Sequence, residues 1–231
     1  MTLFMRIIIA MMLYLSLPIQ AGIIIGGTRV IFDGNSQESA LGLSNPEPAR
    51  AYLVQSWVEP ESGGGKAPFL VTPPLFRLDP GQENILRIVL TRGGLPQDRE
   101  SLFWLNVKSV PELARNESEA NVLHLSVKTR LKLFYRPAAL ARGAQEAYKK
   151  LAFSRQGSDL VVRNPTPYYQ NLKQLSVNDH AIQAEISRLT LPPFGEMRYP
   201  LPVANATQVS WRTITDYGNA TPLQQQALDG H

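Results

Sequence analysis

The chain has 231 residues, of which 44% are hydrophobic and 18% are charged, and its formal net charge is +4. This length allows one large domain or two of about 100 residues, and the composition excludes a disordered chain. The mild positive charge gives no indication of nucleic-acid binding, and the absence of cysteine excludes disulfide-stapled folds and cysteine-based metal sites.

Residues 1–21 are typical of an export signal. Arg6 supplies the positive start, residues 7–17 form an apolar core, and Ala21 is a small residue before a cleavage site ahead of Gly22. The alternative is a membrane anchor, but the apolar run is shorter than the ~20 residues that a spanning helix needs. We therefore expect an exported protein with its signal removed.

Short runs of β-branched and aromatic residues follow, separated by turn residues such as proline, glycine and asparagine. In the run at residues 51–59 both faces are fairly apolar, and we expect Trp57 to anchor a core there. Runs at this spacing are typical of an immunoglobulin-type sandwich. They lie at residues 28–32, 40–44, 51–59, 69–72, 84–91 and 102–107.

The longest run, at residues 121–137, alternates most regularly, which predicts a strand with one apolar and one polar face. We expect part of the apolar row to pack in its own domain and part to meet a partner; an ordinary sandwich strand is the alternative. The apolar parity holds Leu123, Leu125, Val127, Leu131 and Leu133, and the polar parity holds His124, Ser126, Lys128, Arg130 and Lys132.

The composition changes after Pro137. Residues 138–150 are rich in alanine and mildly helical, and shorter strand-like runs follow. We therefore expect an N-terminal domain at residues 22–137 and a smaller C-terminal β domain at residues 138–231, whose polar end makes its last strand doubtful.

No local pattern of catalytic or metal-binding residues is present. The three histidines, His124, His180 and His231, have no metal-binding spacing, and there is no phosphate-binding loop or nucleophile elbow. We expect no catalytic residue, no metal and no cofactor. An exported hydrolase is the alternative, because a catalytic triad can be built from distant residues.

Two basic residues lie inside apolar runs, Arg29 in the first run and Lys132 in the longest one. Such a cation is usually a solvated side chain. Two of them near a domain junction could instead hold a carboxylate through charge-assisted hydrogen bonds.

Several blocks of residues occur in a characteristic order, at 28–34, 72–81, 95–107, 132–137, 164–169 and 216–218. Together they resemble the periplasmic chaperones of chaperone–usher pilus assembly, and the resemblance extends over nearly the whole mature chain. The short loop before the longest run is similar to that of the short-loop subgroup.

The resemblance implies an all-β fold of two immunoglobulin-like sandwiches in a boomerang arrangement. It also implies that Arg29 and Lys132 anchor the C-terminal carboxylate of a pilus subunit. The longest strand would complete the subunit's own unfinished sandwich, with Leu123, Leu125 and Val127 filling its groove.

The resemblance further implies an interdomain salt bridge of Glu100, Arg136 and Asp216. The expected partners are pilus subunits and an outer-membrane usher, in the periplasm and without any cofactor. Glu112 departs from the family pattern, in which a small residue or proline usually follows Pro111. A secreted structural or adhesive β-sandwich protein is the alternative function.

Overall fold

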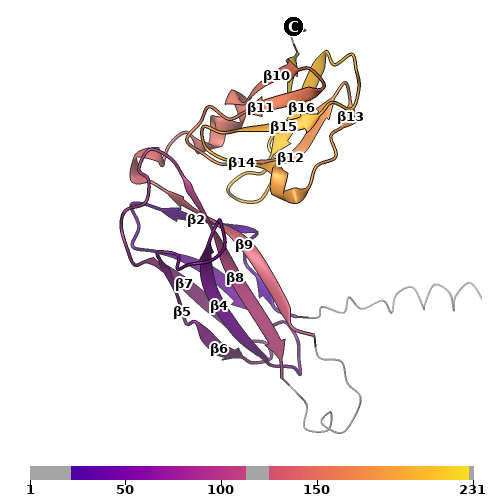
Figure 1. Ribbon diagram of the computed structural model, residues 1–231. Helices are drawn as coiled ribbons and strands as arrows, with labels where there is room; N and C mark the ends of the chain where they lie inside the picture. Colours follow the sequence, from indigo (N-terminus) through magenta and orange to yellow (C-terminus); the bar gives the residue numbers. More distant parts are fainter. Residues whose placement is uncertain (1–21, 113–124, 229–231) are drawn as a thin grey trace, which may run out of the picture.

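The computed structural model describes residues 22–112 and 125–228. It is almost entirely β-structure, arranged as two sandwiches that are joined end to end and bend relative to one another (Figure 1). This confirms the predicted fold class. No helix among the described residues is long and apolar enough to cross a membrane. The predicted export signal and Leu123 lie outside the described residues.

The N-terminal sandwich packs a four-stranded sheet, in the order β1-β3-β7-β5, on a five-stranded sheet, in the order β2-β9-β8-β4-β6. All neighbouring strands are antiparallel except β2 and β9, which are parallel. The strands are β1 Ile24–Ile25, β2 Arg29–Asp33, β3 Glu38–Ser44, β4 Tyr52–Pro60, β5 Phe69–Thr72, β6 Leu75–Leu78, β7 Glu83–Leu90, β8 Ser101–Pro111 and β9 Val127–Arg136.

The core of this sandwich lies between the two sheets. Phe32 of β2 and Leu133 of β9 are fully buried in it. Three aromatic rings link the two sheets. Phe69 of the four-stranded sheet packs edge to face on Phe32 and Phe103 of the five-stranded sheet, at 5.3 and 5.0 Å between ring centroids. With no disulfide available, this apolar contact holds the two sheets together.

The first segment changes sheets between β1 and β2, which pair with β3 and β9 respectively. Gly26 makes the crossing possible: its N–H donates to the Gly42 carbonyl at 2.8 Å, and a Cβ on Gly26 would lie 3.2 Å from that oxygen. The close backbone approach favours glycine. The crossing brings Arg29, the first residue of β2, beside Lys132 of β9.

Two details differ from the sequence predictions. The strand β9 begins at Val127, and Leu125, although described, is not part of it; residues 121–124 of the predicted strand lie outside the described residues. Its ladder with β8 ends at the pair of Val127 with Ser109. Trp57 is not a core anchor: the opposite parity of β4 faces the core, and Trp57 lies half-buried on the outer face.

Two short 3-10 helices, η1 Ala138–Leu140 and η2 Ala144–Lys150, connect the sandwiches where the alanine-rich segment was expected. The second sandwich has a three-stranded sheet, β10-β11-β15, and a sheet in the order β13-β12-β16-β17 with β14 beside β12. Its strands are β10 Ala152–Gln156, β11 Asp159–Arg163, β12 Gln170–Val177, β13 His180–Ala181, β14 Thr190–Leu191, β15 Glu196–Pro200, β16 Gln208–Thr213 and β17 Gln224–Ala227; η3 Ile186–Leu189 precedes β14.

The core of the second sandwich centres on Trp211, whose ring lies 4.4 Å from Phe153 between centroids. The indole N–H of Trp211 donates to the Tyr148 carbonyl of η2 at 3.0 Å, which fastens the connection onto the domain. The last strand, doubtful from sequence, is present: β17 pairs with β16 over four residues.

Candidate functional site

The strand β9 has an open edge along half its length. On one side it pairs with β8 from Val127 to Tyr135, whereas on the other side β2 pairs only with residues 132–136. In the part of the chain that the structure describes, no strand covers the remaining edge of residues 127–131. Unpaired N–H and C=O groups in such a row are a template for another strand.

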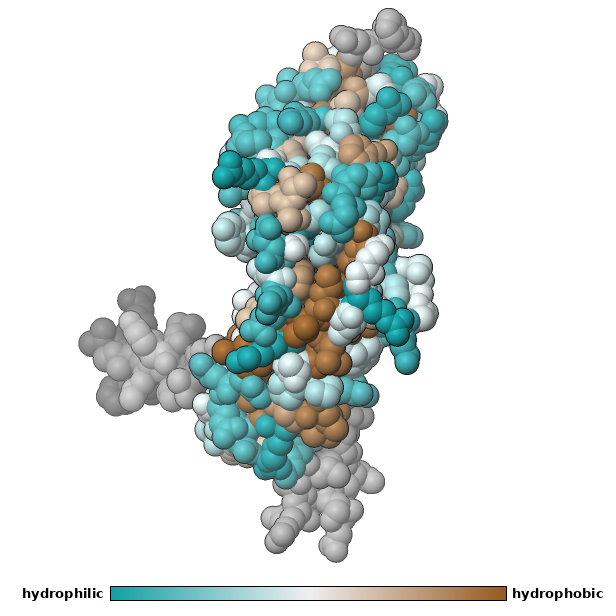
Figure 2. Space-filling model, turned by 90° about the vertical axis from the view of Figure 1, so that its left-hand side faces the viewer, coloured by the Kyte–Doolittle hydropathy of each residue, from teal (hydrophilic) through white to brown (hydrophobic). Residues whose placement is uncertain are grey.

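One apolar row of β9 divides into a buried and an exposed half. Leu131 and Leu133 are 4% and 0% exposed in the core, whereas Val127 of the same row and Leu125, which precedes the strand, are 58% and 67% exposed. The exposed half lies next to the open edge. Leu123, the third residue predicted for this role, lies outside the described residues. Apolar surface also extends over the N-terminal sandwich towards the junction (Figure 2).

The open edge ends at a pair of cations. Arg29 and Lys132 are directly opposite each other in the parallel ladder, so both side chains leave the same, outer face of the sheet. Burial lowers the pKa of Arg29, and Asp216 partly offsets this. The Nη1 of Arg29 donates to the Ile214 carbonyl at 3.4 Å, and its buried Nε has no hydrogen-bond partner in the described residues.

Lys132 faces the second domain. Its ammonium donates to the Oδ1 of Asn171 and the Oγ1 of Thr190, on the paired strands β12 and β14. Burial, followed by the nearby charge of Arg29, lowers the pKa of Lys132 to about 8, and Glu61 acts in the opposite direction. Sequence reasoning missed Asn171 and Thr190, because no pattern in their own strands indicates which distant cation they meet.

The outer face beside the open edge holds further basic side chains against aromatic rings. Lys128 lies 4.9 Å from the centroid of the Trp57 ring, and Arg130 lies 4.5 Å from that of Trp104. Both cations also lie within 3.8 Å of the Glu59 carboxylate. These contacts direct the long side chains across the sheet face, so the strand edge stays accessible.

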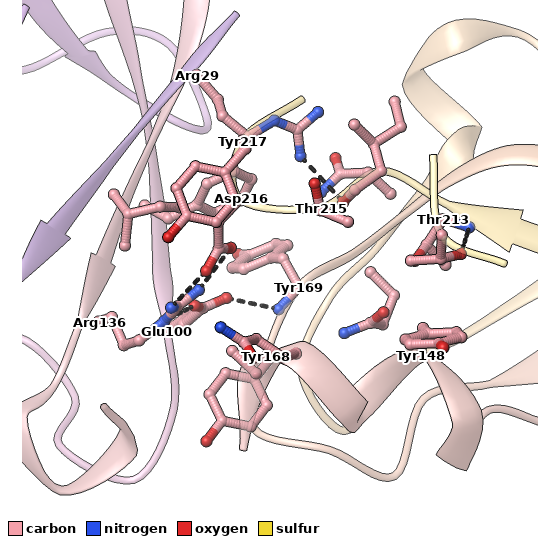
Figure 3. A pocket seen from close by; sticks show the side chains of 18 of the residues that line it. Arg29, Glu100, Arg136, Tyr148, Tyr168, Tyr169, Thr213, Thr215, Asp216 and Tyr217 are labelled. Carbon is pink, nitrogen blue, oxygen red and sulfur yellow. Dashed lines mark hydrogen bonds and ion pairs between the residues drawn. The ribbon is translucent and has the colours of Figure 1, made fainter. Parts of the chain in front are cut away.

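The two sandwiches are linked by ion pairs centred on Arg136 (Figure 3). Its Nε donates to Glu100 Oε1 at 2.7 Å, and its Nη1 and Nη2 form a bidentate pair with Asp216 at 2.8 and 2.9 Å. Arg136 and Glu100 come from the first sandwich, whereas Asp216 follows β16 of the second. Such bidentate pairing fixes orientation as well as proximity.

Glu100 is only 3% exposed, and two groups compensate for the burial of its carboxylate. Besides Arg136, the backbone N–H of Tyr169 donates to Glu100 Oε2 at 2.8 Å (Figure 3). The backbone N–H of Glu100 donates to the Pro167 carbonyl at 2.9 Å. Burial raises the pKa of the Glu100 carboxyl, and the charge of Arg136 counteracts the rise. Removing Arg136 would leave this carboxylate poorly compensated.

An interdomain cavity of about 460 Å³ lies beside Arg29 and these ion pairs. Its lining is partly aromatic, including Phe134, Tyr168 and Tyr169. No group of three or more metal-ligating side chains occurs in the described residues. The site therefore offers an open strand edge, an exposed apolar row and paired cations, which suit the binding of an extended chain with a terminal carboxylate.

Comparisons with known proteins agree with these features. The family described as pili and flagellar-assembly chaperone, PapD N-terminal domain, matches residues 22–141, and the PapD C-terminal domain of pili assembly chaperones matches residues 146–225. The probable fimbrial chaperone LpfB of Escherichia coli O157:H7 is 40% identical over 224 residues, which are 96% of this chain and 95% of LpfB. The chaperone FimC of Escherichia coli K12 is 39% identical over 211 residues, covering 91% of this chain and 86% of FimC.

A solved structure of the Salmonella enterica SafB chaperone in complex with the SafA pilin is also similar. The similarity has a TM-score of 0.79 and 35% sequence identity, and covers 90% of this chain and 96% of the matched one. Both halves of the chain, in their order, thus correspond to those of known chaperones. This chain belongs to the family of pilus-assembly chaperones, two-domain immunoglobulin-like proteins that act by binding and not by catalysis.

Proposed function

We propose that this protein is exported to the periplasm through a signal cleaved after residue 21, where it captures pilus subunits by strand donation and delivers them to an outer-membrane usher. The N-terminal domain, residues 22–137, would supply the donated strand, and residues 138–231 would form the second wall of the cleft. The observation that carries the proposal is the open edge of β9, which ends at Arg29 and Lys132.

The charges at the end of the edge favour one direction for the bound strand. A partner strand parallel to β9 would lie in line with β2 and reach Arg29 with its C-terminus. An antiparallel strand would bring its N-terminus, which is positively charged when free, towards two cations. We therefore propose that a subunit binds parallel to β9, with its terminal carboxylate on Arg29 and Lys132.

The anchor would also set the register. A shift of one residue turns every side chain of a strand to the opposite face, so a fixed carboxylate keeps the exposed row of β9 directed into the subunit. Leu125 and Val127 would then fill the subunit's groove, together with Leu123. Full burial of an aliphatic side chain contributes about 1.5–3 kcal/mol, before the cost of ordering the complex.

The ion pairs of Arg136 with Glu100 and Asp216 would hold the second sandwich at the angle at which it borders the anchor. We propose this orienting role because the bidentate contact joins residues 80 positions apart, from the two domains.

Co-expression in the periplasm with a pilus subunit from the same organism tests the proposal. Wild-type chaperone should co-purify with the subunit as a one-to-one complex, and Arg29→Ala and Lys132→Ala should lose it. Lys108→Ala, on the outer face of β8, is a control that removes a cation away from the edge. A subunit that stays soluble alone and binds no chaperone would favour a secreted structural or adhesive protein.

A further inference from the structure

The acceptors that hold Lys132 are both neutral. Asn171 Oδ1 and Thr190 Oγ1 accept from the ammonium, and the Thr190 hydroxyl lies 3.3 Å from the same Asn171 oxygen. No ion pair joins Lys132 to a carboxylate among the described residues. An ammonium has three N–H donors, so two are engaged by the second domain and one is left for a ligand.

The second domain also holds the other cation of the anchor. The backbone N–H of Ile214 donates to the Asn171 carbonyl at 2.8 Å, and the Ile214 carbonyl accepts from Arg29 at 3.4 Å. Asn171 is 4% exposed. Its side chain accepts from Lys132, and its backbone carbonyl accepts from Ile214, which in turn accepts from Arg29. Both anchor cations are thus positioned by one corner of the second sandwich.

Neutrality matters for what the cation can still bind. A carboxylate at position 171 would pair with Lys132 inside the protein and compensate its charge, leaving less attraction for a second carboxylate. An amide and a hydroxyl orient the ammonium without cancelling its charge. Burial, followed by the charge of Arg29, lowers the pKa of Lys132 to about 8, and Glu61 offsets only part of this effect; a bound carboxylate would favour the protonated ammonium.

We infer that Asn171 and Thr190 are positioning residues of the anchor: they form a neutral clamp that aims the Lys132 ammonium at the terminal carboxylate of the subunit. The inference rests on the proposed function, because it concerns the same anchor. It assigns to the second domain a direct part in subunit recognition, because that domain orients Lys132, a side chain of the first domain.

The test uses the full-length mature chaperone and a synthetic peptide of the subunit's C-terminal strand, made as the free acid and as the C-terminal amide. Wild-type protein should bind the acid more tightly than the amide. Asn171→Asp, which keeps size and shape, should reduce this preference by about tenfold or more, the order expected for hydrogen bonds to charged groups. Its denaturant midpoint should be unchanged or higher, because the new carboxylate pairs with Lys132.

Thr190 provides a second test that adds no charge. Thr190→Val removes the hydroxyl and should weaken acid binding several-fold, whereas Thr190→Ser retains it and should bind as wild type does. Gln174→Ala, exposed on the same strand as Asn171, is the matched control. Two results would overturn the clamp while leaving the proposed function intact. One is an Asn171→Asp variant that prefers the acid as strongly as wild type does, and the other is equal binding of the acid by Thr190→Val and Thr190→Ser. Equal binding of acid and amide by the wild type would overturn the anchor itself.

Discussion

The division of the apolar row of β9 gives a sharp prediction for Val127→Ala. Val127 is 58% exposed and lies beyond the core, so truncating it should change the free energy of unfolding by no more than about 0.5 kcal/mol. In a subunit complex the same side chain would be buried. Losing two methyl groups there should cost about 1.6 kcal/mol, at ~0.8 per buried carbon, which is roughly 15-fold in affinity.

Competition measures this directly. Wild-type and Val127→Ala chaperones with different tags are co-expressed with one subunit, and the ratio of the tags in the purified complex is compared with that in the free pool. Leu133→Ala is the control of the same parity: it is fully buried, so it should destabilise the free protein by about 2–5 kcal/mol. Equal capture by wild type and Val127→Ala would refute the idea that this part of the row enters the subunit.

The remaining predictions concern charge. Arg29→Ala and Lys132→Ala should abolish subunit capture while the urea-unfolding midpoint stays close to wild type; loss of fold in both would contradict an anchoring role. Subunit affinity should fall up to about tenfold per pH unit above pH 8. The reason is that the pKa of Lys132 in the free protein is about 8, and a bound carboxylate favours its protonated form. An affinity of the wild type that does not change from pH 7 to pH 10 would contradict this. Arg136→Ala should cost about 3–5 kcal/mol in urea unfolding, because Glu100 is left buried without its ion pair, and Arg136→Ala with Glu100→Gln should recover part of that loss.

The pH prediction depends on the groups around Lys132. Arg29, on β2, lowers the pKa of Lys132, whereas Glu61, after β4, raises it. Both effects act in the free protein. Glu61→Gln should therefore lower the pKa of Lys132, and with it the pH at which subunit affinity begins to fall. A bound carboxylate raises the pKa of Lys132, so binding above pH 8 takes up a proton and weakens as protons become scarce.

In the proposed function, the residues that would enter the subunit and the residues of the core follow one another along the same row, so binding and folding would use the same pattern. Leu131 and Leu133 stabilise the N-terminal sandwich, and Leu125 and Val127 continue the row beyond it. The ladder with β8 keeps the two halves in register, which transmits the position of the anchor at Lys132 to the exposed end.

Much of the fold could be predicted from the sequence by itself. Alternation of period two depends only on strand geometry, so residues 121–137 predicted a strand with an apolar row, and Arg29 and Lys132 stood out as cations inside apolar runs. The turn residues and the alanine-rich segment after Pro137 indicated two β domains. These features are local, and local stereochemistry is sufficient to produce them.

Tertiary structure decided which part of each pattern meets which neighbour. Both parities of β4 are fairly apolar, so only sheet packing determined that Trp57 lies outside the core. The β9 row divides where its side chains leave the core, and its ladder with β8 ends at the pair of Val127 with Ser109. The clamp on Lys132 joins residues 39 apart, and the Arg136–Asp216 pair joins residues 80 apart. Contacts between domains leave no periodic signal in either strand, because they arise from the angle at which two separately folded sandwiches meet.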